Sequence, residues 1–306
     1  MNNLKKIGLT ALGTTLIASS AFAAEMSVTG AASISFDQTS DKVGGSNVYM
    51  GDSINFKADG EMDNGVTVAV KYEIDGGALD DHSIALGFDG MGTLNFAGHG
   101  GSTSMSAMDD KTPNAYEESW DIVAGKPTVI NGQSGDNSFK YTSASMGGAV
   151  FTVAFVNADA YVDFGVTATP EMIDGLSVGY ARGETSARAA EPKVEATEST
   201  AYVSYAIGSL TLGYQQSEAD SPTAGASTDS KAMGVSYAVT PDFSVAYNTH
   251  KLSLENDPDE QKAVGISASF TMGSMTLAGA SNKVSNIANA AAADVDGYEM
   301  TLSFAF

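Results

Sequence analysis

Five carboxylates gather between positions 109 and 121 of the chain, where Lys111 is the only opposing charge. Carboxylates grouped in this way can attract cations and repel anions, or they can act as general acids and bases beside a nucleophile. No constellation of acid, base and nucleophile is recognisable in the sequence, so an electrostatic role is favoured over catalysis. The candidate residues are Asp109, Asp110, Glu117, Glu118 and Asp121.

Three lysines, Lys57, Lys71 and Lys140, lie in segments where bulky and small residues alternate. Successive side chains of a β-strand point to opposite faces, so each lysine is expected to face away from its apolar neighbours. The three lysines therefore form a candidate basic wall opposite the five carboxylates. The neighbours that set this assignment are Phe56, Val70, Tyr72, Phe139 and Tyr141.

Other chemistry-bearing patterns are missing from the sequence. His82, His99 and His250 are widely separated and form no paired-histidine motif, and the chain contains no cysteine. The glycine-rich stretch 98–101 lacks the Gly-Lys-Ser/Thr that follows in a phosphate-binding loop, and no Gly-x-Ser-x-Gly elbow occurs. We therefore expect no catalytic residue, no metal site and no cofactor.

Acidic loops leave one alternative open, because carboxylate oxygens are the ligands that Ca²⁺ prefers. These residues lack the spacing and the glycine of an EF-hand loop, so an ordinary solvated acidic rim is the favoured interpretation. The residues concerned are Glu255, Asp257, Asp259 and Glu260 in one loop, and Asp294 and Asp296 in another.

The composition limits the classes of protein to which this chain can belong. The 306 residues carry 37 acidic and 15 basic side chains, a net charge of −22, which argues against nucleic acid as a partner. With 43% hydrophobic residues the chain is too apolar to be disordered. Its mean hydropathy of −0.05 is that of an ordinary soluble domain.

The first 23 residues are expected to be a secretory signal peptide, leaving 24–306 as the mature chain. Lys5 and Lys6 precede a short apolar core, and Ala21-Phe22-Ala23 supplies the small residues that a signal peptidase requires. Removal of both lysines would make the mature charge −24, because 13 basic residues remain against 37 acidic ones. No later stretch approaches the roughly 18 apolar residues of a membrane-spanning helix.

Alternation of period two runs through the mature chain. In the last segment Tyr298, Met300, Leu302 and Phe304 fall on one face, while the other carries small or polar residues. A soluble sandwich would carry many charges on its second face, whereas a face of Gly, Ala, Ser and Thr suits a wall that lines water. The bulky face then meets lipid, which predicts a transmembrane β-barrel.

Sixteen such segments can be counted, joined alternately by short turns and by longer acidic loops, as in an outer-membrane barrel. The longest connector runs from Gly100 to Asp136 and carries the five carboxylates and Trp120, the single tryptophan, which suggests packing against a wall. The expected strands are 26–36, 48–61, 66–75, 81–88, 93–99, 137–145, 149–158, 161–169, 176–182, 199–207, 210–217, 230–239, 243–254, 261–271, 275–282 and 295–306.

Taken together, these segments resemble a general diffusion porin of the Gram-negative outer membrane, of the alphaproteobacterial type. The resemblance rests on the start at 24–30, the hairpin from Ser53 to Tyr72, the long third loop and the closing strand 297–306. It implies an antiparallel sixteen-stranded barrel, a homotrimer, and passive diffusion of small hydrophilic solutes. It also implies that the C-terminal aromatic, here Phe306, is the signal read by the outer-membrane assembly machinery.

In proteins of this type the third loop folds into the barrel and narrows the channel. Loop acids opposite the lysine wall would set up a transverse field across that constriction, which the resemblance also implies. An alternative for the wall is local pairing, of Lys71 with Glu73 or of Lys140 with Asp136 or Asp163.

We therefore expect a water-filled channel in the cell outer membrane with weak cation preference. Lipid and lipopolysaccharide are the expected surroundings, and divalent ions bridging acidic loops to lipopolysaccharide phosphates are a further hypothesis. The alternatives are a substrate-specific porin, a non-conducting structural or adhesive barrel with a plugged lumen, and a soluble secreted β-protein or hydrolase.

Overall fold

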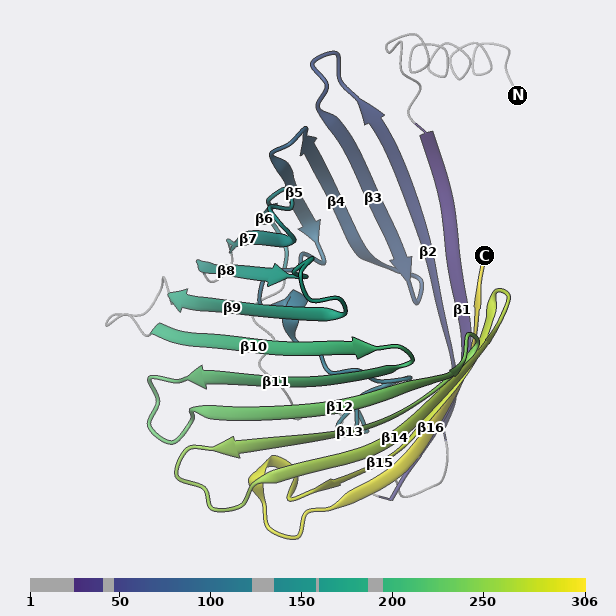
Figure 1. Ribbon diagram of the computed structural model, residues 1–306, viewed down its shortest axis with the longest axis vertical. Coiled ribbons are helices and arrows are strands. Elements are labelled where there is room, and N and C mark those ends of the chain that lie inside the picture. Colours follow the sequence, from purple (N-terminus) through teal and green to yellow (C-terminus); the bar gives the residue numbers. More distant parts are fainter. Residues whose placement is uncertain (1–24, 41–46, 123–134, 158–159, 187–194) are drawn as a thin grey trace, which may run out of the picture.

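The computed structural model describes residues 25–40, 47–122, 135–157, 160–186 and 195–306, and these form sixteen antiparallel strands closed into a barrel (Figure 1). Each strand pairs with its neighbours in the chain, and β1 closes the ring by pairing with β16. The predicted fold class is therefore confirmed. The expected signal peptide, residues 1–23, lies outside the described residues.

The strand bounds are β1 (Glu25–Thr39), β2 (Asn47–Glu61), β3 (Thr67–Asp75), β4 (Ala78–Phe88), β5 (Gly92–His99), β6 (Ser138–Thr142), β7 (Ala149–Val156), β8 (Tyr161–Ala168), β9 (Leu176–Ser186), β10 (Glu195–Ile207), β11 (Leu210–Asp220), β12 (Thr228–Thr240), β13 (Phe243–Leu254), β14 (Gln261–Met272), β15 (Met275–Ser285) and β16 (Val295–Ala305). Two short 3₁₀ turns, η1 (Ser106–Met108) and η2 (Ile287–Asn289), complete the regular elements of the described chain. Among the described residues no helix has the length and apolar character needed to cross a membrane.

The two faces of the sheet differ as the alternation predicts. Large apolar side chains such as Ile266, Tyr298 and Met300 are exposed on the outer face, while their neighbours on the inner face are small or polar. Burial on the inner face occurs where the chain between β5 and β6 packs against it. One cluster there contains Met105, Met108, Val156, Tyr161 and Ala181, and a second contains Trp120, Ala232, Ala263 and Val284.

Strand positions were predicted better at the short-turn rim than at the long-loop rim. The expected strand 176–182 extends to Ser186 as β9, and the expected strand 199–207 begins at Glu195 as β10. One exception lies at the short-turn rim, where the expected strand 137–145 already ends at Thr142 as β6. The added residues, 183–186 of β9 and 195–198 of β10, are all polar or small, so hydrophobic alternation gives no signal for them.

The seam between β1 and β16 is completed by the C-terminal residue. The Phe306 N–H donates to the Gly30 carbonyl at 2.9 Å, and the Gly30 N–H donates to the Phe306 carbonyl at 2.8 Å. The Phe306 ring packs over Gly30, where a Cβ atom would lie 2.6 Å from ring atom Cε2 and 2.9 Å from the Ser53 carbonyl oxygen. Gly30 is therefore required for this close approach.

Replacing Gly30 with valine is expected to weaken the seam, because its Cβ must displace the Phe306 ring and also meets fixed backbone. Overpacking of this kind costs about 1–3 kcal/mol. The measurement is the temperature at which the purified barrel loses its heat-modifiable mobility on gels. Ile34→Val, on the same outer face of β1, is the matched control, and equal transition temperatures for both variants would contradict the role given to Gly30.

Candidate functional site

The five carboxylates lie on one stretch of chain, residues 101–122, here called the acidic segment. Its base is closed by a bridge in which the Gly135 N–H donates to the Gly101 carbonyl at 3.0 Å. Beside the bridge, His99 Nδ1 lies 2.6 Å from Asp136 Oδ1. The two ends of the long connector are therefore held together where it leaves the sheet.

The first part of the acidic segment is held by Asp163 of β8. Its carboxylate accepts the backbone N–H groups of Ser104 at 3.1 Å and Met105 at 2.8 Å, and the Asp163 side chain is 1% exposed. The Lys140 ammonium donates to Ser102 Oγ and to the Thr103 carbonyl, both at 3.2 Å. A buried acid and a partly buried lysine thus fix the start of the segment.

The middle of the acidic segment rests on β11 and β12. Gln215 accepts from the Lys111 N–H at 2.8 Å and donates to the Met108 carbonyl at 2.5 Å. Gly213 and Gly234 lie directly opposite each other in the two strands, and Pro113 lies so close above them that neither position has room for a Cβ atom. These two inner-face glycines therefore allow the segment to pack directly against the backbone of the sheet.

The far end of the acidic segment is held by inner-face side chains from β13 to β16. Each tether joins one residue of the segment to one strand. The Ala115 N–H donates to Ser267 Oγ at 3.2 Å, the Ser119 N–H donates to Asn248 Oδ1 at 3.0 Å, Asn282 Nδ2 donates to the Glu118 carbonyl at 3.2 Å, and the Tyr116 and Thr301 hydroxyl oxygens are 2.7 Å apart.

Trp120 packs against the sheet, as its isolation in a polar stretch predicts. Its ring is 5% exposed and lies 4.4 Å, centroid to centroid, from the His250 ring of β13. Ala232, Ala263 and Val284 surround it from β12, β14 and β15. The tryptophan therefore anchors the end of the segment on four adjacent strands.

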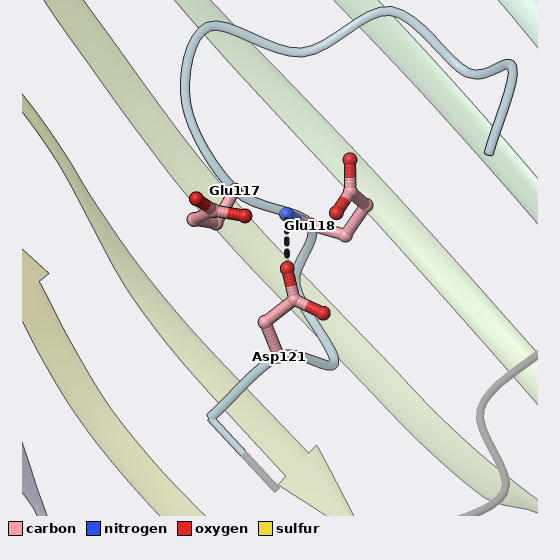
Figure 2. A group of neighbouring side chains, drawn as sticks. All are labelled: Glu117, Glu118 and Asp121. Carbon is pink, nitrogen blue, oxygen red and sulfur yellow. Dashed lines mark hydrogen bonds between the residues drawn. The ribbon is translucent and has the colours of Figure 1, made fainter. Parts of the chain in front are cut away.

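Three of the predicted acids form a compact group, shown in Figure 2: Glu117, Glu118 and Asp121. One candidate ligand oxygen from each lies within 4.8 Å of the others, so the group could hold a divalent cation. The Glu118 N–H donates to Asp121 Oδ2 at 3.1 Å, and Asn114 Nδ2 donates to Glu118 Oε1 at 2.6 Å. The structure therefore gathers carboxylates that would repel one another if all were ionised.

Burial and the crowding of carboxyls raise the pKa values of these acids. Removal from water, followed by hydrogen bonding with the Asp110 and Asp121 carboxyls, raises the pKa of Glu118 well above its ordinary value. Glu117 is still exposed, but partial removal from water, followed by hydrogen bonding with and repulsion from Asp121, raises its pKa to about 7. Burial, with a smaller contribution from Asp110, also raises the pKa of Asp109.

The three lysines of the predicted wall lie on the sheet itself, on β2, β3 and β6, whereas the five acids lie on the acidic segment. Lys57 and Lys71 lie directly opposite each other on β2 and β3, and Lys57 pairs with Asp59 at 3.1 Å. Lys71 pairs with Glu73 at 2.7 Å and with Asp81 at 3.0 Å, so the alternative of local pairing is observed for it. Lys140 contacts the start of the acidic segment, while Asp136 pairs with His99.

The two acidic loops considered for Ca²⁺ form other contacts. Glu260 pairs with Lys251 and Lys262, and Asp294 lies 3.8 Å from Lys283. Glu255 accepts the Gly225 N–H at 3.1 Å. Within the described residues, acids able to surround an ion are found in the acidic segment and not in these loops. The solvated acidic rim stays the favoured interpretation of these loops, with calcium binding as the open alternative.

The tethering side chains were missed by reasoning from the sequence alone, apart from Asp163, which was considered only as a partner of Lys140. A signal existed, because most inner-face positions carry Gly, Ala, Ser or Thr. Larger polar side chains interrupt that pattern and mark places where something packs against the wall. These are Gln215, Asn248, His250 and Asn282.

A closed barrel with an apolar outer face and a polar inner face is the architecture of a membrane channel. A family model described as "Gram-negative porin" matches residues 8–263, and the chain belongs to this family. A search of proteins with curated functions finds no match. Family and fold together define an outer-membrane porin channel.

Several solved structures have the same fold as this chain, although their sequence identity to it is low. A loop L8 deletion mutant of OmpT, an outer membrane protein of Vibrio cholerae, has a TM-score of 0.71 and 13% identity over 93% of this chain and 100% of that one. OmpT of Vibrio cholerae itself has a TM-score of 0.69 and 12% identity, over 93% and 98%. A mutant of the Rh. blastica porin has a TM-score of 0.66 and 14% identity, over 92% and 100%.

Replacing Trp120 with alanine is expected to free the end of the acidic segment, because loss of a buried tryptophan costs about 3–5 kcal/mol of packing. Single-channel recordings in planar bilayers should then show a larger unit conductance with more open-state noise. Phe151→Ala, which removes an exposed aromatic side chain from the outer face, is the control. Identical conductance in wild type and Trp120→Ala would show that the segment does not depend on this anchor.

Proposed function

We propose that this porin is a water-filled channel for passive diffusion of small hydrophilic solutes and ions, with weak cation preference. The acidic segment is proposed as its constriction. The observation that carries this proposal is the set of tethers that hold the segment against the inner face from β8 to β16. A segment held in this way reduces the free cross-section and brings its carboxylates to the narrowest point.

Cation preference follows from the balance of charges near the segment. Lys71 is already paired with two acids, and Lys140 donates to the segment itself. The acids Glu117 and Asp121 are exposed, so passing ions meet more negative than positive charge there. A net charge of −22 on the chain adds counter-ion enrichment at the entrance.

The proposal requires neither catalysis nor a cofactor. A substrate-specific porin remains a second candidate, which competition by a bound solute in conductance recordings would reveal. A non-conducting structural barrel predicts negligible conductance, so single-channel recording of the purified protein separates it from a channel. Three-step closure of the current would support the proposed homotrimer.

The partners proposed for assembly follow from the C-terminus. Phe306 is 74% exposed at the end of β16, and its side chain is therefore accessible as a signal for the outer-membrane assembly machinery. Outer-membrane lipid and lipopolysaccharide are the proposed surroundings of the apolar outer face.

Neutralising the acid group is expected to lower cation preference. In the triple variant Glu117→Gln, Glu118→Gln, Asp121→Asn, the ratio of cation to anion permeability should fall about two- to fivefold, because removing a partly screened charge changes ion energies by under 1 kcal/mol. Reversal potentials in a salt gradient measure this ratio.

The matched control for this variant removes the same number of acids from an outer loop. Glu255→Gln, Asp257→Asn, Asp259→Asn should change the reversal potential much less, since these residues lie in the connector between β13 and β14 and not in the acid group. An equal change of the reversal potential in both triple variants would show that total charge sets the ion selectivity. The proposal that the acidic segment is the selective constriction would then be wrong.

Cation preference is also expected to rise with pH. The raised pKa of Glu117, about 7, means that its carboxyl is neutral in acidic solution and negative in alkaline solution. The permeability ratio should therefore increase between pH 5 and pH 9, with its steepest change near neutrality, because ordinary carboxyls have finished titrating at about pH 5–6. Glu117→Gln should remove this step, and an unchanged pH profile in that variant would disprove the assignment.

A further inference from the structure

His250 of β13 is a buried titratable residue that the proposed channel does not use. It is 0% exposed, and its ring lies 4.4 Å, centroid to centroid, from the ring of Trp120. Neither Nδ1 nor Nε2 has a hydrogen-bond partner among the described residues. A neutral imidazole carries one donor and one acceptor nitrogen, and buried groups of this kind are normally paired. The position of His250 therefore requires a physical explanation.

The surroundings of His250 are apolar. Ala232 of β12 and Ala263 of β14 lie directly opposite it in the neighbouring strands, and both are buried. Leu252, the next inner-face residue of β13, is also buried. Trp120 covers the ring from the acidic segment and packs in one cluster with the two alanines. The imidazole is therefore enclosed mainly by hydrocarbon and by the indole ring.

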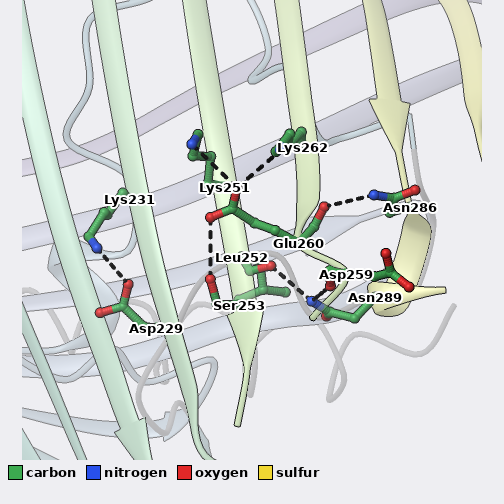
Figure 3. Close-up of polar contacts among 10 residues, drawn as sticks. All are labelled: Asp229, Lys231, Lys251, Leu252, Ser253, Asp259, Glu260, Lys262, Asn286 and Asn289. Carbon is green, nitrogen blue, oxygen red and sulfur yellow. Dashed lines mark hydrogen bonds and ion pairs between the residues drawn. The ribbon is translucent and has the colours of Figure 1, made fainter. Parts of the chain in front are cut away.

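The lysines at this level of the wall point away from His250. Successive strand residues point to opposite faces, so a residue that follows or precedes an inward side chain points outward. Each of these lysines is paired with an acid, as Figure 3 shows for three of them. The pairs are Lys231 with Asp229 at 3.2 Å, Lys251 and Lys262 with Glu260 at 3.3 and 3.5 Å, and Lys283 with Asp294 at 3.8 Å.

Other acids near the ring lie on the acidic segment and in the connector between β13 and β14. Glu118 and Asp121 are close to Trp120 in the chain, and the Glu118 N–H donates to Asp121 Oδ2 at 3.1 Å. Asp259 lies in the connector, where its carbonyl accepts Asn289 Nδ2 at 2.6 Å (Figure 3). Within the described part of the chain none of these acids bonds to the imidazole. A proton added to the buried ring would therefore create a cation without a counter-ion.

Protonation of His250 conflicts with its place beneath Trp120. It adds a second N–H where the first already lacks an acceptor, and it places an unpaired charge in an apolar site. That cost is much larger than the attraction between a cation and the face of an indole ring. In water the same imidazole becomes charged below about pH 6.5. Acid therefore favours a state in which Trp120 has moved away and water reaches the ring.

We propose that His250 and Trp120 form an acid-sensitive switch, which holds the end of the acidic segment on the wall at neutral pH and releases it in acid. The released state binds one more proton than the docked state. Its equilibrium constant therefore rises about tenfold for each pH unit below about 6.5, or about 200-fold between pH 7 and pH 4. Asp163 and Gln215 still tether the first part of the segment, so release is confined to its end.

The acids of the segment respond to pH in the opposite direction. Protonation of Glu117, Glu118 and Asp121 removes the repulsion among their carboxylates, and this favours the docked segment in acid. Release of Trp120 in acid is opposite in sign to that effect. The direction of the change therefore distinguishes titration of His250 from titration of the acid group.

The experiment measures the fluorescence of Trp120, the single tryptophan of the chain, in the purified porin in detergent between pH 7 and pH 3.5. In wild type, acid should shift the emission reversibly to longer wavelength and increase quenching by acrylamide, because the indole becomes solvated. In His250→Phe, which keeps an apolar ring beneath Trp120 but cannot be protonated, both should stay at their pH 7 values. His99→Gln, which removes a histidine paired with Asp136, is the matched control and should retain the wild-type transition.

A second measurement leaves His250 and Trp120 unchanged. The chain contains three histidines, so the double variant His82→Gln, His99→Gln keeps His250 as the only one. NMR of ring-labelled histidine in this variant should report protonation of His250 at the same pH as the change in Trp120 emission. Heat-modifiable mobility on gels checks that the barrel of each variant is folded.

Three outcomes would overturn the switch. Unchanged emission and quenching of wild type down to pH 3.5 would show that acid does not release Trp120. A transition of wild-type size in His250→Phe would assign the release to another group. Protonation of His250 without a change in Trp120 emission would show that the buried site accepts the charge. None of these measurements requires ion flow, so failure of the proposed channel function would leave them interpretable.

Discussion

The closed ring of backbone hydrogen bonds is the constraint on which the rest of this structure depends. In hydrocarbon an unpaired N–H or carbonyl costs several kcal/mol, so a sheet can cross a membrane only if it has no free edge. The pairing of β1 with β16, extended by Phe306 and Gly30, removes the last edge. Closure then requires long strands with unbroken pairing, and this leaves side-chain alternation as the only way to give the two surfaces different chemistry.

Alternation explains why the fold could be predicted from the sequence. Each membrane-facing position must be apolar and each inner position small or polar, so the pattern is repeated in strand after strand and survives an error at any one of them. Alternation no longer predicts strand positions where the strands leave the membrane. The last residues of β9 and the first of β10 lack apolar alternation, and backbone pairing between the two strands keeps them extended.

The charges of the acidic segment could be predicted from the sequence, but its conformation could not. Its composition and length are local properties of the sequence, as is the isolation of Trp120. Its tethers to β11 and to β13–β16 join residues more than 100 positions apart, such as Lys111 with Gln215 and Ser119 with Asn248. No periodicity encodes such pairs. Strand parity likewise places Lys71 on the inner face but cannot decide between a place in the lysine wall and pairing with Glu73 and Asp81, and the wall stays a proposal.

The inner face also shows how a barrel wall can hold a long connector in place. Glycines at 213 and 234 bring Pro113 close to the sheet, and single amide or carboxylate side chains satisfy backbone groups of the segment that would otherwise lack partners. Each tether is a direct hydrogen bond, so the segment lies close to the wall. Crowding the carboxyls of Glu117, Glu118 and Asp121 opposes folding, since it disfavours their ionised forms. The buried packing of Trp120 and the tethers hold the segment against the wall despite that cost.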